Sequence, residues 1–543
     1  MEISFFAIKI MLVVGTIGFY IGLFGIFRKA GFAPWKALIP VYNLWVWIKV
    51  LSRPWRWMLY CLIPFINVFM FFMMVWKTIR LFGKTTYAWL FPSTLFFFIS
   101  LPYFGFSRKE HYTRLEDLPE FVKSSWRSWL DAIVYAVFAA YIIRMFMAEL
   151  YTIPTSSMES SLMVGDYLVV EKMKYGSRLP ETILAVPFVH HTLPLTRTVK
   201  SYVRWLTLPY YRFPAFSPVN ASDVIVFNYP DGDTVALERQ SESYYEIVRE
   251  FETMLNPAAP EYAVECLYRK YPPEMIDYIK MKYGGKYTPG KGKTAVSQEY
   301  HVVARPVDKR ENYVKRCVAA AGDTLQIIDA QVYINHQPQK NPPKMQLAYM
   351  VSDSSRIGLS RKKRKELNIN EEDVHRWNEY TTIYYLFDEQ KEKIEQMGFH
   401  VRRKSEVAGN FNYAIFPHDP RYPWNVDNFG PVVIPKKGAT VLLNDSTLVL
   451  YEKVIRNYEG HDLQKRDGKI YLDGAIVETY TFAMNYYFAM GDNRHNSADS
   501  RFWGFLPEDH IVGSPCLVWL SLDKFKEWGE HKIRWNRMFK IVK

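Results

Sequence analysis

The chain has 543 residues, which is too long for one ordinary domain and predicts two or three folded units. Aromatic residues make up 17% of it and crowd the first 150 positions, and together with a net charge of +13 they favour membrane segments flanked by basic loops. No nucleic-acid partner is expected, because no nucleic-acid-binding motif accompanies the charge, and the four cysteines lack the spacing of a zinc site or a disulfide framework.

Four apolar stretches precede residue 151, and each approaches the length needed to cross a bilayer. They cover about residues 3–27, 57–76, 87–106 and 129–150, whereas a shorter apolar piece at 40–47 is expected to lie at the membrane interface. The first stretch lacks the basic start and small-residue exit of a removable signal peptide, so we expect it to stay in the membrane.

The loops between these stretches carry unequal positive charge, and this predicts a topology. Residues 28–56 hold six Lys and Arg, residues 77–86 hold three, and residues 107–128 hold five. By the positive-inside rule the first and third loops are cytoplasmic, so everything after residue 150 lies outside. We therefore predict a membrane module over 1–106 with about three transmembrane helices, followed over 107–150 by a basic cytoplasmic loop and an anchoring helix.

The remainder of the chain has the pattern of a mostly antiparallel β domain, with short β-branched runs separated by Gly, Asn, Asp and Pro. We expect this domain to occupy 151–335 and 430–525. Two polar intervals, 233–300 and 340–430, have helical stretches and are expected to be α/β insertions, and residues 526–543 form a basic tail. The basic run at 361–365 is expected to be solvated and to touch anionic lipid.

Three short segments of the β domain carry residues suited to catalysis. The first, Pro154-Thr-Ser-Ser-Met158, places serines where the last apolar stretch ends, but a serine hydroxyl needs a neighbouring base to become a nucleophile. The second, Tyr313-Val-Lys-Arg316, places a lysine inside a strand-like segment that ends at Gly322-Asp323. Lowering a lysine pKa from about 10.4 to between 7 and 8 by burial costs roughly 4 kcal/mol, and the neutral amine then serves as a base.

The third segment, Met490 to Gly504, is a dense polar loop of Asp, Asn, Ser and Arg closed by aromatic residues. It is typical of a network that orients a nearby side chain. Calcium is the alternative, because Asp492, Asn493 and Asp499 offer oxygen ligands, although Arg494 and Arg501 oppose a cation.

These three segments, in this order behind a membrane anchor, resemble the type I signal peptidase family. Pro154 to Met158 matches its nucleophile motif with one change, Tyr313 to Arg316 its lysine motif, and Gly491 to Arg501 its complete third motif. A further family strand is matched by 222–230. The first hundred residues resemble a small membrane module found fused to such peptidases in Bacteroidetes-type bacteria.

The resemblance implies transmembrane α-helices followed by a signal-peptidase-like β fold, and it implies roles for individual residues. Ser157 would be the nucleophile, Lys315 the general base, and Ser497 a hydrogen-bond partner of the lysine amine. The oxyanion would be bound by the backbone N–H of Ser157 and the hydroxyl of Thr155. The loop would be supported by Asp499 and Arg501, and the small pockets for an Ala-x-Ala sequence would be lined by Tyr151, Ile153, Leu162 and Val314.

The function that the resemblance implies is that of a serine endopeptidase that removes signal peptides from exported preproteins. It would be a multi-pass protein of the bacterial cytoplasmic membrane with its catalytic domain on the periplasmic face. Its partners would be preproteins, the lipid bilayer and, as a further candidate, the secretion translocon, and neither a metal nor an organic cofactor is implied.

Two alternatives remain at this point. A penicillin-recognising acyltransferase uses Ser-x-x-Lys, which occurs at 360–363 and 521–524, but no Lys-Thr-Gly segment accompanies it. The other alternative is a catalytically silent membrane scaffold that binds preproteins or translocon components. The joint presence of Ser157, Lys315 and Ser497 argues against it.

Overall fold

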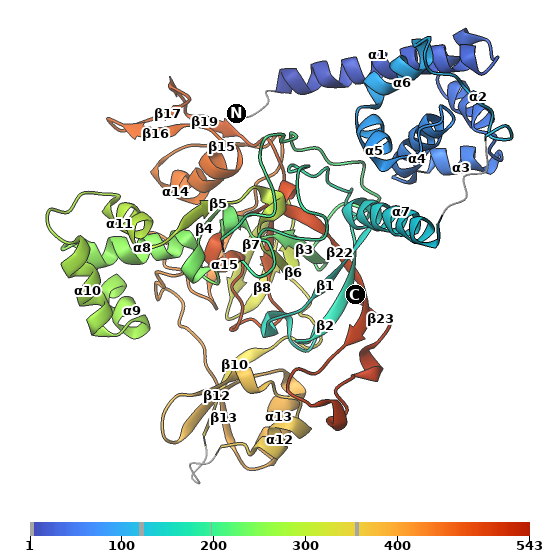
Figure 1. Ribbon diagram of the computed structural model, residues 1–543. Coiled ribbons are helices and arrows are strands. Elements are labelled where there is room, and N and C mark those ends of the chain that lie inside the picture. Colours follow the sequence, from blue (N-terminus) through green and yellow to red (C-terminus); the bar gives the residue numbers. More distant parts are fainter. Residues whose placement is uncertain (1–4, 64, 119–123, 197, 353–357, 543) are drawn as a thin grey trace. The chain divides into compact units, whose positions relative to one another are not determined.

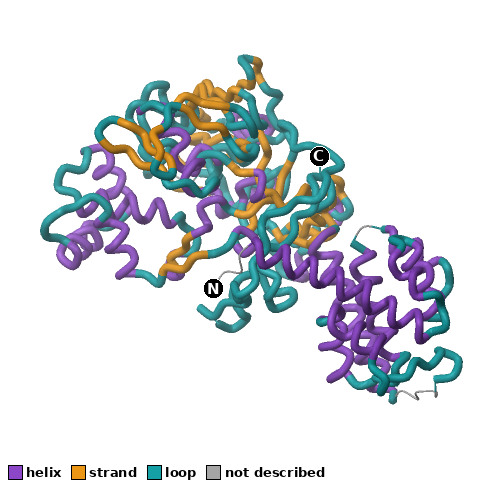
Figure 2. Tube along the Cα trace, turned by 90° about the horizontal axis from the view of Figure 1, so that it is seen from above, coloured by secondary structure: helices purple, strands orange, loops and turns teal. Residues whose placement is uncertain are grey.

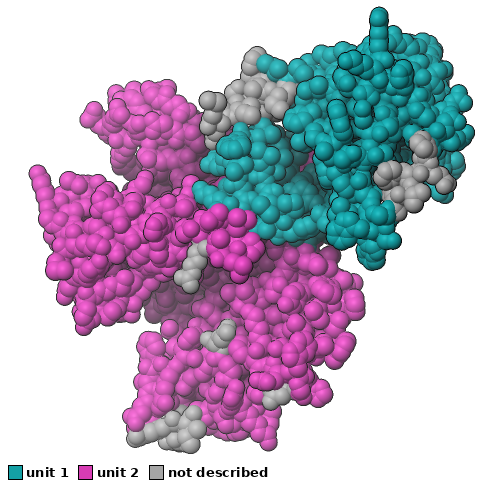
Figure 3. Space-filling view, viewed as in Figure 1, with its two compact units in different colours: residues 1–149, 179–190, 200–211 teal, residues 150–178, 191–199, 212–543 magenta. Residues whose placement is uncertain are grey.

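The computed structural model describes residues 5–63, 65–118, 124–196, 198–352 and 358–542. The chain forms two compact units, coloured separately in Figure 3. Unit 1 comprises Met1–Glu149, Leu179–His190 and Lys200–Tyr211, and unit 2 comprises Leu150–Arg178, His191–Val199 and Arg212–Lys543.

Unit 1 is mainly helical, and its helices pack side by side as a bundle (Figures 1 and 2). Its longest helix, α1, packs closely on α6 because glycines remove side chains from the contact: a Cβ added to Gly25 would lie 2.8 Å from the Cα of Gly105. The helices are α1 Phe5–Lys29, α2 Tyr42–Val50, α3 Arg56–Leu62, α4 Ile66–Arg80, α5 Tyr87–Leu95, α6 Phe97–Phe106 and α7 Ser125–Phe146.

Two of the described helices are long and apolar enough to cross a membrane. They are α1, over Leu12–Lys29, and α7, over Ser125–Phe146. Helices α5 and α6 meet at a bend of 111° and together make either a third, broken span or a re-entrant loop. The predicted stretch at 57–76 is divided between α3 and the 15-residue α4, and the number of spans remains a prediction.

Unit 2 is built on an antiparallel, eight-stranded sheet. Its strand order is β1-β2-β22-β3-β6-β20-β21, with β23 also paired to β22. Every residue of β3 and β20 is buried, as expected for central strands, whereas β2 alternates between buried and partly buried positions. The strands are β1 Ala148–Thr152, β2 Asp166–Glu171, β3 Val224–Asn228, β6 Asn312–Ala319, β20 Tyr486–Met490, β21 Leu506–Pro507, β22 Ile511–Ser521 and β23 Lys540–Ile541.

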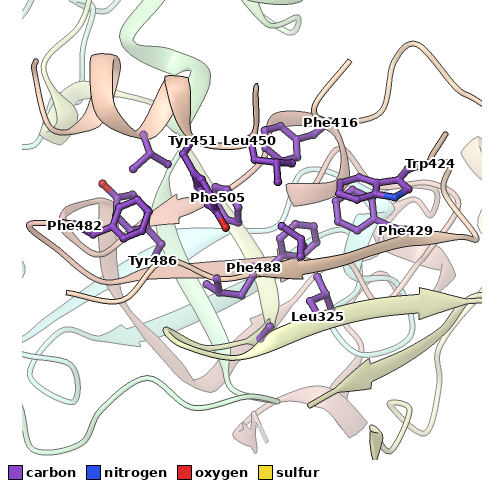
Figure 4. Close-up of a cluster of buried hydrophobic side chains, with 14 of the residues drawn as sticks. Leu325, Phe416, Trp424, Phe429, Leu450, Tyr451, Phe482, Tyr486, Phe488 and Phe505 are labelled. Carbon is purple, nitrogen blue, oxygen red and sulfur yellow. The ribbon is translucent and has the colours of Figure 1, made fainter. Parts of the chain in front are cut away.

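A second sheet extends this scaffold and encloses the largest apolar core of unit 2. Its order is β14-β7-β8-β9, and the bounds are β14 Phe429–Val433, β7 Thr324–Ile328, β8 Gln331–Ile334 and β9 Gln337–Pro338. Aromatic rings fill the core, where Tyr451 of α14 (Asp445–Lys453) stacks on Phe505 at a centroid distance of 5.7 Å (Figure 4). Small ribbons complete this region: β15 Thr440–Leu442 with β19 Thr479–Thr481, and β16 Leu463–Arg466 with β17 Lys469–Leu472 and β18 Ala475–Ile476.

Two insertions stand on the β scaffold, and each has a core of its own. The helical insertion lies in the chain between two paired strands, β4 (Thr234–Ala236) and β5 (Val302–Ala304). It contains α8 Tyr244–Leu255, α9 Glu261–Lys270, α10 Pro273–Tyr283 and α11 Lys291–Glu299. The β insertion is a sheet of order β11-β12-β10-β13, with bounds β11 Val374–Arg376, β12 Thr381–Leu386, β10 Leu347–Ser352 and β13 His400–Arg403. It also contains the helices α12 Arg361–Glu366 and α13 Asp388–Gln396.

The predicted fold class is confirmed, since apolar helices precede a mostly antiparallel β domain with α/β insertions. The short β-branched runs from which the β domain was predicted include 167–170, 223–227 and 331–334, and these form β2, β3 and β8. The positions of α9, of α11 and of the strands in the β insertion were not predicted, because their segments are too polar or too short to show a clear period.

Candidate active site

The serine segment forms a tight turn directly after β1. Pro154 has no N–H to donate to a strand neighbour, and the chain then makes a single 3-10 turn, Ser156–Met158. Ser156 and Met158 are buried, whereas Ser157 between them is partly exposed. The turn is therefore anchored by its flanking residues while Ser157 remains accessible.

Lys315 lies on the central strand β6, opposite Ile225 of β3, and only 4% of its surface is exposed. Its Nζ donates a hydrogen bond of 2.6 Å to the Oγ of Ser157. The structure thus brings together the serine and the lysine that sequence analysis had selected from segments 158 residues apart.

The surroundings of Lys315 favour its neutral form. Burial lowers the pKa of this amine from 10.5 to about 8, and the carboxylates of Asp499 and Asp492 oppose the shift without cancelling it. At pH 8 the neutral fraction is roughly a hundredfold larger than for an unperturbed lysine. The amine is therefore able to accept a proton from the adjacent hydroxyl near neutral pH.

Two arginine–carboxylate pairs shape the polar loop that follows β20. The guanidinium of Arg316 donates two hydrogen bonds of 2.8 Å to Asp492, and that of Arg501 donates bonds of 2.9 and 2.8 Å to Asp499. Arg501 also binds the carbonyl of Arg494. Because both carboxylates are already paired with arginines, the calcium alternative is disfavoured.

The same loop also holds the backbone of the turn Ser156–Met158. The backbone N–H of Asn493 donates to the carbonyl of Ser157 at 3.1 Å, and its side-chain amide donates to the carbonyl of Ser156 at 3.3 Å. Gly491 permits this approach, because an added Cβ would lie 2.5 Å from the Ser157 carbonyl oxygen. Position 491 therefore requires glycine, because there is no room for a side chain.

Ser497 differs from its expected role. It is buried close to Gly491, but among the described residues its hydroxyl has no hydrogen-bond partner, so the expected bond to the amine of Lys315 is not formed. The lysine instead donates to Ser157.

Thr155 and the apolar residues lie around the turn. Thr155 is exposed and precedes η2 (Ser156–Met158), and its hydroxyl does not cap that turn. Ile153 and Leu162 are buried in one cluster, against which Tyr151 and Val314 pack in partly buried positions. The four residues expected to line the substrate pockets therefore share one apolar surface next to Ser157.

Sequence analysis missed Asp373, which the β insertion contributes to the site. Its carboxylate accepts hydrogen bonds from the Oγ of Ser156 at 2.6 Å and from the amide of Asn496 at 2.7 Å, and only 2% of the residue is exposed. Asp373 ends an acidic run that follows a basic one, which is the pattern of a solvated surface, so no sequence signal marked it.

Gln346, at the start of the β insertion, makes a second connection to the polar loop. Its backbone N–H donates to the carbonyl of Asp492, and its own carbonyl accepts from the N–H of Arg494. His495, which was not assigned to catalysis, accepts a bond from the N–H of Ala348 at Nδ1 and therefore donates from Nε2 to Asp427. It is a structural link.

The described carboxylates offer one cluster with metal-ligand spacing, Glu242, Glu246 and Glu250 of the helical insertion. The ammonium group of Lys270 lies between them, at 2.5 to 3.0 Å from an oxygen of each. A lysine thus satisfies this cluster in place of a metal ion.

Comparison with known proteins identifies the family of the chain. Residues 126–386 and 432–520, more than half of the chain, match the family described as Signal peptidase, peptidase S26. The chain belongs to the signal peptidase S26 family. Residues 35–114 also match a family of unknown function (DUF5684).

Individual relatives of this signal peptidase carry the name Signal peptidase I. The protein of Buchnera aphidicola subsp. Acyrthosiphon pisum is 24% identical over 412 residues, which cover 74% of this chain and 78% of the relative. The Haemophilus influenzae protein is 47% identical over 133 residues, covering 24% of this chain and 33% of the relative. The present chain is accordingly a serine endopeptidase of the signal peptidase I type, with apolar helices for membrane association.

Proposed function

We propose that Ser157 and Lys315 form the catalytic dyad of this signal peptidase and that it cleaves preproteins after Ala-x-Ala-like sequences. The observation that carries the proposal is the 2.6 Å separation between the Lys315 Nζ and the Ser157 Oγ at a buried site. The lowered pKa of the lysine, about 8, supplies the neutral base that a serine nucleophile requires.

The reaction follows from this geometry. As the Oγ of Ser157 attacks the scissile carbonyl carbon, its proton passes to the Nζ of Lys315. The resulting ammonium gives that proton to the departing amine of the mature protein, which leaves the signal peptide as an ester on Ser157. Lys315 then takes a proton from a water molecule that attacks the ester and passes it to the Oγ of Ser157 as the ester bond breaks. The signal peptide leaves as a carboxylic acid, which loses its proton to solvent, and both members of the dyad return to their starting state.

Binding of the developing oxyanion is assigned to the backbone N–H of Ser157 and the hydroxyl of Thr155. The bonds from Asn493 to the carbonyls of Ser156 and Ser157 support this assignment, because they fix the turn that orients the Ser157 amide. Removing one oxyanion donor costs about a hundredfold to a thousandfold in kcat. In this proposal Ser497 turns toward the lysine amine when substrate binds, Asp499 acts on the lysine through its charge, and Arg501 holds the loop by pairing with Asp499.

Specificity is assigned to the apolar surface of Tyr151, Ile153, Leu162 and Val314. Ile153 and Leu162 are almost fully buried, so the surface next to Ser157 is shallow and closed by branched side chains. Such a surface accepts alanine and excludes larger side chains by steric conflict, because close-packed residues have little room to move.

The proposed location is the cytoplasmic membrane, with several spans and with the catalytic unit on the periplasmic face. The basic loops before α7 support this orientation. Unit 1 also exposes apolar side chains outside its helices, namely Ile183, Leu184, Val186, Phe188, Val203 and Trp205. These residues are suited to contact with lipid. We propose that the protein also contacts preproteins and the secretion translocon at this surface.

Cleavage of a preprotein with an Ala-x-Ala site, by the full-length protein in detergent, tests the proposal. Ser157→Ala and Lys315→Ala should each abolish turnover, whereas the control Lys437→Ala, at an exposed position, should retain it. Retained turnover in either dyad variant would remove that residue from the mechanism. If the wild-type protein binds the preprotein without cleaving it, the silent scaffold becomes the correct function.

A further inference from the structure

Unit 2 contains a large cavity on the far side of the nucleophile segment from the apolar cluster. It has a volume of about 750 Å³, which is within the range of ligand-binding sites. Glu159, Ser160 and Met163 line it, whereas Met158 and Leu162 of the same segment are buried in the apolar cluster. The cavity therefore begins two residues after Ser157.

The other walls of the cavity come from the β insertion and from residues 523–540, and they are strongly basic. Seven Lys and Arg side chains face three carboxyl groups. The basic residues are Lys344, Arg361 and Lys365 from the β insertion and Lys526, Arg534, Arg537 and Lys540 from the C-terminal segment.

In the part of the chain that the structure describes, carboxylates pair with four of the seven basic residues and leave three lysines unpaired. Glu371 pairs with Arg361 at 3.8 Å, and Asp523 pairs with Arg534 at 3.4 Å and with Lys526 at 3.8 Å. Arg537 pairs at 2.5 Å with Asp166, which does not line the cavity. Burial raises the pKa of the third carboxyl group of the wall, Glu159, to about 7, so it is only partly ionised at neutral pH.

Three of the lysines in the wall have no carboxylate partner. Within the described residues, Lys344, Lys365 and Lys540 form no ion pair, and all three are exposed to the solvent that fills the cavity. The charges of Arg537 and Lys344 add to burial in lowering the pKa of Lys540. Such crowding of like charges is relieved when an anion binds.

The position of the cavity indicates which anion it receives. A substrate that places small side chains on the surface of Ile153 and Leu162 must continue past Ser157 with the residues of the mature protein. An extended chain advances about 3.3 Å per residue, so roughly the third to eighth mature residues would reach a cavity of this size. Segments that have just crossed a membrane are poor in Lys and Arg.

We propose that this cavity binds acidic side chains of the mature protein shortly after the scissile bond. The proposal rests on the proposed function, since it takes Ser157 as the point of cleavage. It gives the β insertion a role in choosing substrates, because three of the basic residues belong to it.

Substrate pairs and a matched pair of variants test this proposal. The preproteins share one Ala-x-Ala site and differ only in mature residues three to eight, which are either acidic or glutamine. The test variant is Lys365→Glu, and the control is Lys362→Glu, an exposed residue of the same helix that does not line the cavity.

We expect the wild-type protein in detergent to cleave the acidic substrate with a kcat/KM roughly tenfold higher at low salt, as several screened charge pairs together provide. The single variant Lys365→Glu should reduce this preference about threefold. The double variant with Lys344→Glu and Lys365→Glu should remove the preference. Lys362→Glu should keep it. About 0.5 M NaCl should weaken it in every variant because salt screens the charges.

An absent preference in the wild-type protein, or equal preferences in Lys365→Glu and Lys362→Glu, would overturn the proposal. A separate arm measures the binding of two fluorescent peptides, which span the cleavage site and carry either the acidic or the glutamine residues. They are added to Ser157→Ala protein with and without Lys365→Glu. If no substrate is cleaved, the proposed function fails, but the peptide binding measured in this arm still decides whether the cavity binds acidic segments.

Anionic lipid is the competing ligand, and vesicles distinguish it. Flotation with vesicles of phosphatidylglycerol or of phosphatidylcholine measures lipid binding by the same variants. If Lys365→Glu loses binding to the anionic vesicles while its substrate preference is unchanged, the cavity is a lipid site and the proposal is wrong.

Discussion

The two insertions of unit 2 are similar in that each has its own core, but they differ in what they contact. The helical insertion is held internally, with Lys270 bridging Glu242 and Glu250, and Tyr245 reaching Asp233 at its base. None of its described residues in α8–α11 hydrogen-bonds to Ser157, Lys315 or the polar loop. The β insertion, in contrast, places Asp373 against Ser156 and joins Gln346 to that loop.

This difference shows that the size of an insertion does not indicate its part in catalysis. A segment with its own core is free to fold on the scaffold without affecting the site. Under the proposed mechanism, the buried carboxylate of Asp373 couples the β insertion to the reaction by binding the turn that holds Ser157, because the precision of a site depends on the residues behind it.

Among changes within the two insertions, replacing Asp373 should have the largest effect on activity. Asp373→Ala removes the acceptor for Ser156 and Asn496, and we expect kcat to fall roughly tenfold to a hundredfold, as for other supports of a reactive group. Asp373→Asn keeps one acceptor oxygen and should recover part of the activity. The control is Asp277→Ala, at an exposed position of α10, and an equal loss there would refute the contrast between the insertions.

The pH dependence should show whether Asp373 acts by position or by charge. Below about pH 8, kcat/KM should rise about tenfold per pH unit, because the base is active only after Lys315 loses its proton. Asp373→Ala should keep this midpoint. Asp499→Asn should move it to lower pH, because the Asp499 carboxylate raises the pKa of the lysine. Measured pH profiles of the three proteins would contradict this account if Asp373→Ala shifted the midpoint as well.

Removal of the helical insertion should have a smaller effect. Its ends meet in the β4–β5 ribbon, where Ala236 is opposite Val302 and the N–H of Leu237 donates to the carbonyl of His301, so residues 238–300 can be replaced by a two-residue Asn-Gly turn. We expect kcat/KM to stay within about threefold of the wild type, because the site keeps its contacts. A hundredfold loss, with an unchanged circular dichroism spectrum for the remaining strands, would show that this insertion also serves catalysis.

Substitution of Lys315 should change the stability of the fold, and this is the smallest of the expected effects. The sign of the change shows whether the buried amine destabilises the fold. A lysine with a folded pKa of about 8 and an unfolded value of 10.5 destabilises the fold by roughly 3 kcal/mol at pH 7. Because the unfolded state binds the extra proton, this penalty disappears as the pH rises from about 8 to 10.5. Lys315→Met should therefore raise the unfolding temperature by a few degrees at pH 7 and less at pH 10. A lower unfolding temperature at pH 7 would mean that the amine is stabilised by contacts that offset its burial.

Much of the scaffold could be predicted from sequence because its signals are local. Alternating or fully apolar runs marked β2, β3 and β8, and three motifs identified the residues around Ser157 and Lys315. The hydrogen bond of Ser497 to Lys315 was expected from the family pattern, but among the described residues the Ser497 hydroxyl has no partner, and a sequence motif does not record the orientation of one side chain.

The parts that could not be predicted depend on contacts between distant segments. Asp373 is separated from Ser156 by 217 residues, and its own neighbourhood is that of a polar surface. The cavity between Glu159, Lys365 and Lys540 likewise combines three segments whose individual compositions are unremarkable for a basic protein. Tertiary packing, and not local propensity, gives these residues their roles.

The position of β22 has a consequence for the timing of activity during synthesis. This strand lies between β2 and β3, although it follows them by hundreds of residues, and Ser521 at its last position binds the carboxylate of Asp166 in β2. A growing chain therefore cannot close the sheet behind Ser157 until residues 511–521 have left the ribosome and joined it. Under the proposed mechanism, the enzyme therefore gains activity only after its last long strand has joined the sheet, so segments made earlier fold before Ser157 can attack a peptide bond.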